Sequence, residues 1–119
     1  MKTTLVIGAS QNPERYSYKA VLSLIKHGFT VVALGLKTGE INGIKILNNK
    51  PQVSNIDTVT LYISLKNQAE WIDYILYLNP KRIIFNPGAE NDSFFSIASK
   101  RGIECFNART LLMLSVGTY

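Results

Sequence analysis

Residues 3–15 carry the strongest local signal in the chain and read Thr3-Thr4-Leu5-Val6-Ile7-Gly8-Ala9-Ser10-Gln11-Asn12-Pro13-Glu14-Arg15. An apolar run rich in β-branched residues ends at Gly8, small polar residues follow, and a helical pattern then begins, which predicts a strand, a tight turn and a helix. This order is typical of a phosphate-binding loop, because glycine lets the backbone approach a ligand and a helix N-terminus attracts anions. An ordinary strand-to-helix turn without a ligand is the alternative.

The turn supplies several groups that can contact phosphate oxygens. Ser10, Asn12 and Ser17 carry hydroxyl or amide donors, and Arg15 can form a two-pronged contact through its guanidinium. Ser10 or Asn12 is also expected to cap the helix. We therefore predict that these side chains, together with Gly8, bind an anionic ligand.

Length and composition limit the class of protein. The chain has 119 residues, 46% hydrophobic and 18% charged, which suits one compact domain over residues 1–119. Neither a signal peptide nor an apolar run of membrane-spanning length is recognisable, so we expect a cytoplasmic protein. The formal net charge is +5, but the basic residues are scattered, which argues against nucleic acid and favours a small anionic ligand.

Strand and helix patterns alternate along the chain. Beyond the first strand, strands are predicted at residues 29–34, 57–63, 82–86 and 103–106. Helices are predicted at residues 15–27, 67–78, 93–101 and, for a turn or two, 109–114. A loop is predicted at residues 35–40 and an irregular connection at 41–51, with a short extended piece at 45–47.

This alternation predicts an α/β, Rossmann-like fold: a doubly wound, mainly parallel sheet of about five strands with helices on both faces. Ligands of such sheets lie beyond the carboxyl ends of the strands, where the strand order reverses. The loops at residues 8–17, 35–37 and 86–90 are therefore expected to meet at one edge of the sheet.

The nature of the ligand is indicated by two sequence features. Gly8 matches only the first glycine of the G-x-G-x-x-G dinucleotide motif. Lys37 follows the second predicted strand, where an NAD site would have an acidic residue. A lysine there favours a ligand with an extra ribose phosphate, such as NADP or coenzyme A. A solvated loop lysine is the alternative.

The turn after the fourth predicted strand is the other candidate for ligand contact. It contains Pro87, Gly88 and Glu90, and its glycine can bring the backbone close to a ligand. Asn91 or Asp92 is expected to cap the following helix. We assign Glu90 and Asp92 to this helix start and not to a metal site, because no further ligand is near them in the sequence.

Enzymatic activity finds little support in the sequence. The single histidine, His27, precedes Gly28 at a predicted helix end, and the single cysteine, Cys105, lies in a predicted buried strand. No nucleophile is recognisably paired with a base. We predict no catalytic residue.

Four stretches together point to a known family: Gly8-Ala9-Ser10 with Asn12-Pro13-Glu14-Arg15 and Ser17-Tyr18, Gly43 with Lys45, Asp57-Thr58-Val59-Thr60-Leu61-Tyr62 with Asn67-Gln68, and Pro80-Lys81-Arg82-Ile83-Ile84-Phe85-Asn86-Pro87-Gly88-Ala89-Glu90-Asn91. With these, the chain resembles the small stand-alone coenzyme A-binding domain proteins, which are related to the nucleotide-binding half of the succinyl-CoA synthetase alpha subunit. The last stretch is the most specific.

The resemblance implies a Rossmann-like protein that binds coenzyme A or an acyl-coenzyme A without chemistry. It places the pyrophosphate over Gly8, Ala9, Ser10 and Asn12, with contacts from Arg15 and Ser17, and it places the adenosine 3′-phosphate near Lys37. Gly35-Leu36 stands where the family often has Asn-Pro, from which a looser loop is expected.

Two other functions remain open from the sequence. One is an NADP-dependent reductase or nucleotide sensor, and the other is a protein-interaction module with a vestigial cleft. The apolar tail Leu111-Leu112-Met113-Leu114 has corresponding interpretations: a helix that covers the core, a contact for a protein partner, or a contact between two copies in a homodimer.

Overall fold

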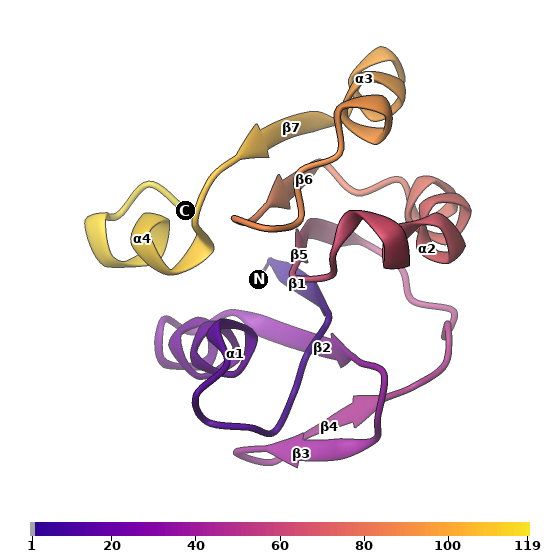
Figure 1. The fold of residues 1–119 in the computed structure, drawn as a ribbon. Helices are drawn as coiled ribbons and strands as arrows, with labels where there is room; N and C mark the ends of the chain where they lie inside the picture. The colour runs from indigo at the N-terminus through magenta and orange to yellow at the C-terminus, as the bar shows by residue number, and fades with distance from the viewer. Residues whose placement is uncertain (1) are drawn as a thin grey trace.

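The computed structural model describes residues 2–119 as one seven-stranded sheet in the order β3-β4-β2-β1-β5-β6-β7 (Figure 1). Neighbouring strands are parallel except β3 and β4, which are antiparallel. The strands are β1 (Thr3–Ile7), β2 (Thr30–Leu34), β3 (Gly39–Ile41), β4 (Ile44–Leu47), β5 (Ile56–Leu61), β6 (Arg82–Phe85) and β7 (Glu104–Asn107).

Helices cover both faces of this sheet. They are α1 (Tyr16–Lys26), α2 (Leu65–Leu78), α3 (Asp92–Lys100) and α4 (Thr110–Val116). Figure 1 shows α1 and α4 on one side of the sheet and α2 and α3 on the other. None of the helices within residues 2–119 is long and apolar enough to cross a membrane. The predicted Rossmann-like α/β fold with a doubly wound sheet is confirmed.

Each face of the sheet has its own core, because successive side chains of a strand point to opposite faces. On β1, Leu5 and Ile7 belong to the core under α2 and α3. Val6, between them, belongs to the other core with Val21 and Leu24 of α1. All six residues of β5 are buried, as expected for a central parallel strand with helices on both faces.

The sheet has seven strands where about five were expected. The short extended piece predicted at residues 45–47 is confirmed as most of β4, whereas β3 was not predicted. The predicted loop at residues 35–40 is wrong at its end, since Gly39 begins β3. Asn42 and Gly43 have φ values of 46° and 86° and join β3 to β4 with Ile41 opposite Ile44. An Asn-Gly pair with both φ values positive is the preferred two-residue hairpin turn. This dipeptide was the available sequence signal for the hairpin.

Cys105 lies in a more exposed strand than predicted. β7 pairs only with β6 and forms an edge of the sheet, so Cys105 is half-buried and not buried, and Phe106 is 37% exposed. Burial still raises the pKa of the Cys105 thiol. His27 ends α1 as predicted, with Nδ1 2.7 Å from the Ser23 carbonyl oxygen.

A buried amide ties the loops that follow β5 and β6. Gln68 is 1% exposed, and its Nε2 donates to the carbonyl oxygens of Ile63 at 3.0 Å and Ala89 at 2.6 Å. Its Oε1 accepts a hydrogen bond from Nδ2 of Asn91 at 2.9 Å. Asn91 also caps α3 as predicted, accepting from the Phe94 N–H. The two loops therefore form one rigid unit.

Replacing Gln68 with leucine should destabilise the fold, because the substitution leaves these buried partners unsatisfied. We expect the free energy of unfolding to fall by about 3 kcal/mol, since each unsatisfied buried polar group costs about 1–3 kcal/mol. Urea unfolding measures the loss. The matched control is Gln52→Leu, whose amide makes only an exposed 3.4 Å contact with Tyr77. Equal losses in both variants would contradict this role for Gln68.

Candidate ligand-binding site

The carboxyl ends of β2, β1, β5 and β6 share one edge, because these neighbouring strands are parallel. From β1 the chain passes through α1 to β2 on one side, and it later enters β5 on the other side of β1. The strand order therefore reverses between β1 and β5, which is where doubly wound sheets bind ligands. The β1–α1 and β6–α3 loops both leave this edge (Figure 1).

Gly8 is fixed between neighbouring strand tips. Its φ is +98°, and a Cβ atom added there would lie 3.0 Å from the carbonyl carbon of Tyr62. The N–H groups of Gly8 and Ala9 both donate to the Leu34 carbonyl oxygen at 2.9 Å. These two N–H groups therefore bind the loop to β2 and are already occupied.

Ser10 and Asn12 stabilise the loop locally. The Ser10 hydroxyl accepts from the Asn12 N–H, and Asn12 Oδ1 accepts from the Glu14 N–H, both at 3.1 Å. The prediction that one of them caps α1 is wrong, because each accepts from an N–H before the helix. Arg15 occupies the N-cap position and makes no side-chain capping bond. The first-turn N–H groups of α1 therefore lack a side-chain cap.

Gly35 has a packing role in place of the loosening that the sequence suggested. It is buried, and a Cβ atom there would overlap the carbonyl oxygen of Ala9 and approach Cγ2 of Ile46 to 2.9 Å. Nearby, Gln11 Oε1 accepts from the Glu40 N–H at 3.1 Å and ties the loop to β3. The tip of β2 is thus pressed directly against the predicted phosphate-binding loop.

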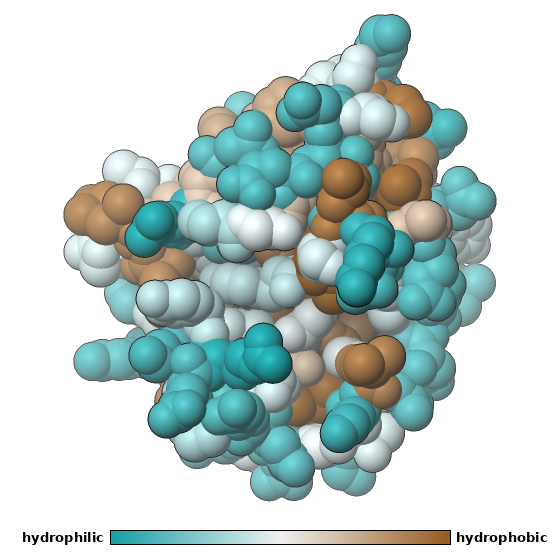
Figure 2. Space-filling model, viewed as in Figure 1, coloured by the Kyte–Doolittle hydropathy of each residue, from teal (hydrophilic) through white to brown (hydrophobic). Residues whose placement is uncertain are grey.

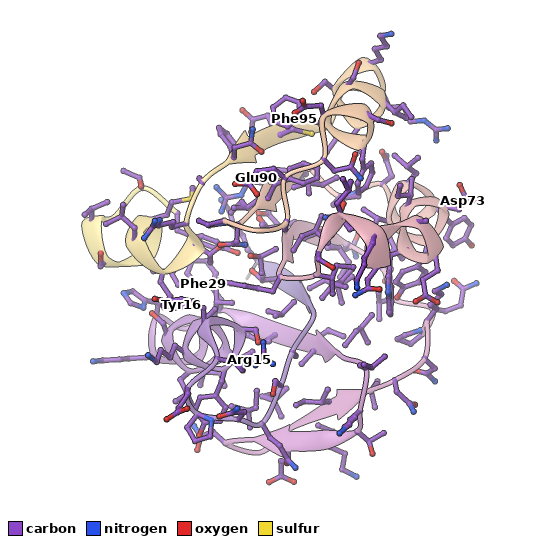
Figure 3. The ribbon with its side chains drawn as sticks, in the orientation of Figure 1. Arg15, Tyr16, Phe29, Asp73, Glu90 and Phe95 are labelled. Atoms are coloured by element: carbon purple, nitrogen blue, oxygen red, sulfur yellow. The ribbon has the colours of Figure 1, made fainter. Side chains whose placement is uncertain are left out.

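The other predicted contacts lie along the same edge with different exposures. Arg15 and Lys37 are exposed, whereas Ser17 is only 4% exposed. Glu90 Oε1 accepts from the Gly88 N–H at 2.8 Å. In Figure 3, Arg15 marks the start of α1 and Glu90 marks the β6–α3 loop, with the ribbons of β1 and β5 between them. Ligand contact by these residues stays a prediction.

A cleft of about 430 Å³ opens between the start of α1, the ends of β5 and β6, and α4. Its lining residues are Tyr16, Tyr62, Asn86, Pro87, Arg109, Leu111, Leu112 and Ser115. Of the residues predicted to bind ligand, only Pro87 lines it. Tyr16 and Asn86 lie in loops that were predicted to meet at this edge, but they were not named as ligand contacts. Sequence reasoning missed the lining residues of α4 because no local pattern shows that α4 folds back beside the start of α1.

A buried polar network holds α4 in place at this cleft. Asn86 is 2% exposed, and its Nδ2 donates to the Thr60 hydroxyl at 2.7 Å and the Leu61 carbonyl oxygen at 3.0 Å. Asn86 Oδ1 accepts from the Thr110 N–H at 2.9 Å, and the Thr60 and Thr110 hydroxyls are 2.7 Å apart. The amide of Asn86 is therefore fully engaged within the protein.

Tyr62 lies next to this network, because its phenol interacts with the Thr110 and Thr60 hydroxyls. Burial raises the pKa of Tyr62 from 10.0 to about 12, while the Thr110 and Thr60 hydroxyls act in the opposite direction. The phenol therefore stays protonated at neutral pH and can donate a hydrogen bond to a ligand.

The parallel strands, the strand reversal between β1 and β5 and the helices on both faces define a Rossmann-like α/β domain, a class that binds ligands at this switch point. The chain belongs to the CoA binding domain family, whose model matches residues 2–115. The resemblance to coenzyme A-binding domain proteins is thereby confirmed.

Solved structures share the fold over nearly the whole chain. A crystal structure of an uncharacterized protein is 47% identical, with a TM-score of 0.97, and the match covers 100% of this chain and 98% of that one. A conserved hypothetical protein from Pyrococcus furiosus is 23% identical, with a TM-score of 0.81 and coverages of 94% and 98%. A protein from Thermus thermophilus is 18% identical, with a TM-score of 0.87 and coverages of 99% and 90%. The comparison with curated proteins gave no match.

The packing of Gly35 can be tested by Gly35→Ala. The added methyl group overlaps the Ala9 carbonyl oxygen, so one strand tip must move, and we expect the free energy of unfolding to fall by about 2–3 kcal/mol. The control is Gly43→Ala, where nothing lies within 4 Å and only the φ of +86° opposes the change, at about 1 kcal/mol. A Gly35 variant as stable as the Gly43 variant in urea would contradict the packing.

Tyr62 should make stability fall at alkaline pH. The folded-state pKa of Tyr62, about 12, lies above the ordinary value of 10.0. The contribution of Tyr62 to the free energy of unfolding is therefore complete below about pH 10 and is lost as the pH rises toward 12. Burial also raises the pKa of Tyr119 and Tyr74, so Tyr62→Phe should reduce the fall without abolishing it. Urea unfolding across this pH range measures the decrease in the free energy of unfolding. The control is Tyr77→Phe, because Tyr77 is 69% exposed and its variant should show the same decrease as the wild type.

Proposed function

We propose that the protein binds coenzyme A or an acyl-coenzyme A without chemical conversion. The observation that carries this proposal is membership of the CoA binding domain family over residues 2–115. The geometry supports this proposal, because the strand reversal, the β1–α1 loop that begins at Gly8 and the uncapped start of α1 suit a phosphate-bearing ligand. We also propose a cytoplasmic location for the protein.

The pyrophosphate is proposed to lie at the start of α1. Because the Gly8 and Ala9 N–H groups are bonded to Leu34, we propose that these two residues shape the loop, while the first-turn N–H groups of α1 and the Arg15 guanidinium contact the phosphates. Ser17 is nearly buried and is proposed to contribute its backbone N–H. Ser10 and Asn12 are proposed to hold the loop in the shape that the ligand needs, through their hydrogen bonds to the N–H groups of Asn12 and Glu14.

The 3′-phosphate is proposed to pair with Lys37. Within residues 2–119 the structure has one ion pair, between Arg82 and Asp57 at 4.0 Å, so neither Lys37 nor Arg15 is held by a carboxylate. An exposed lysine beyond β2 suits a phosphate dianion. Pro87, Gly88 and Glu90 would flank the ligand from the β6–α3 loop.

Isothermal titration calorimetry with coenzyme A and 3′-dephospho-coenzyme A tests this assignment. We expect the wild type to bind coenzyme A about tenfold more tightly than the dephospho form, the value of one charged hydrogen bond. Lys37→Ala should reduce the ratio to about one. Lys26→Ala removes an exposed lysine from the far end of α1 and should keep the ratio.

The outcomes are distinguishable. Equal binding of the two ligands by the wild type would contradict the assignment of Lys37. Failure of coenzyme A to bind at all would contradict the proposed function. Tighter binding of NADP than of coenzyme A would favour the reductase or sensor instead.

A further inference from the structure

The cleft beside α4 combines apolar walls with a single charged residue. Leu111, Leu112 and Pro87 supply the apolar surface, and Arg109 is the one charged residue in the lining. Its volume of about 430 Å³ lies near the lower end of the range of about 300–1,000 Å³ for ligand pockets. The cleft therefore suits one part of a large ligand.

Arg109 is not committed to the fold. It is exposed, forms no ion pair among the described residues and, although it is the N-cap residue of α4, makes no side-chain capping bond. Glu90, in the neighbouring loop, is outside the lining and bonds the Gly88 N–H. The guanidinium thus lacks a carboxylate partner and is free to pair with an anion.

The cleft adjoins the proposed pyrophosphate site at two points. Tyr16 directly follows Arg15 and begins α1, and the backbone carbonyl group of Tyr62 lies against Gly8. Both tyrosines line the cleft. A coenzyme A molecule with its pyrophosphate at the start of α1 can therefore extend its pantetheine arm past these rings toward α4.

We propose that the cleft holds the thioester end of an acyl-coenzyme A whose short acyl group ends in a carboxylate, and that Arg109 selects this group by pairing with it. The inference rests on the proposed function. Methylene groups of the acyl chain would contact Leu111 and Leu112, and the protonated Tyr62 hydroxyl would donate to a carbonyl oxygen of the ligand. No bond is made or broken.

The chemistry of the lining favours this acyl class over a purely apolar one. A purely apolar acyl chain would offer the Arg109 guanidinium no acceptor, whereas a terminal carboxylate supplies one. Asn86 cannot replace the arginine as a donor, because its amide is fully bonded to Thr60, Leu61 and Thr110. Figure 2 shows hydrophobic surface over α4, where Leu112 is 55% exposed, so one wall of the cleft remains open to solvent.

Calorimetry with two stable thioethers of coenzyme A tests the inference: S-(3-carboxypropyl)-coenzyme A and its primary amide, which differ only in the charged end. We expect the wild type to bind the carboxylate about tenfold more tightly than the amide. Arg109→Gln should bring this ratio to within about twofold. Because the two thioethers share the whole coenzyme A part, any change in the attraction of that part cancels in the ratio. Arg101→Gln, which removes the same charge at the end of α3, should keep the full ratio.

A ratio near one in the wild type would overturn the inference, as would a full ratio in Arg109→Gln. Free coenzyme A separates this failure from that of the proposed function. If coenzyme A binds and no preference for the carboxylate is seen, only the inference fails; if coenzyme A does not bind, both fail. Should Arg109→Gln not fold by circular dichroism, the wild-type ratio and its decrease with added salt decide the question.

Discussion

Close backbone packing at the tips of β1, β2 and β5 is the constraint on which the rest of the structure depends. Gly8 lies against the backbone of Tyr62, and Gly35 lies against the carbonyl oxygen of Ala9. Since neither position has room for a side chain, the three tips meet directly. This contact sets the direction in which the chain leaves β1, and hence where α1 begins and where its uncapped N–H groups point.

Two buried amides near the proposed site serve the fold. Gln68 joins the loops after β5 and β6, and Asn86 joins the tips of β5 and β6 to α4. Both amides are satisfied within the protein, so neither is available to a ligand. Groups without such partners include the first-turn N–H groups of α1, which have no side-chain cap, and the exposed side chains of Arg15, Lys37 and Arg109.

The sequence predicted those parts of the molecule whose causes are local. The run that ends at Gly8 and the helix that follows Asn91 both have local signals, in side-chain periodicity and in capping chemistry, and the structure has them. Of the β3–β4 hairpin, only the extended piece at residues 45–47 was predicted. The pairing with β3 was missed although Asn42-Gly43 signals it, because the three residues of β3 resemble a loop. The cleft was missed for a different reason: Arg109 and Tyr62 line the same cleft only because of the tertiary packing of α4, which no local pattern encodes.

The requirement at Gly35 has a consequence for how this protein can change over evolutionary time. Mutations at the strand tips are constrained by the fold, because a single added methyl group there displaces the backbone. Side chains such as Tyr16 and Arg109 project from the same edge without such a constraint. The scaffold and the selectivity of the site are thus encoded by separate residues, and a lineage can acquire a new ligand preference while its architecture stays intact.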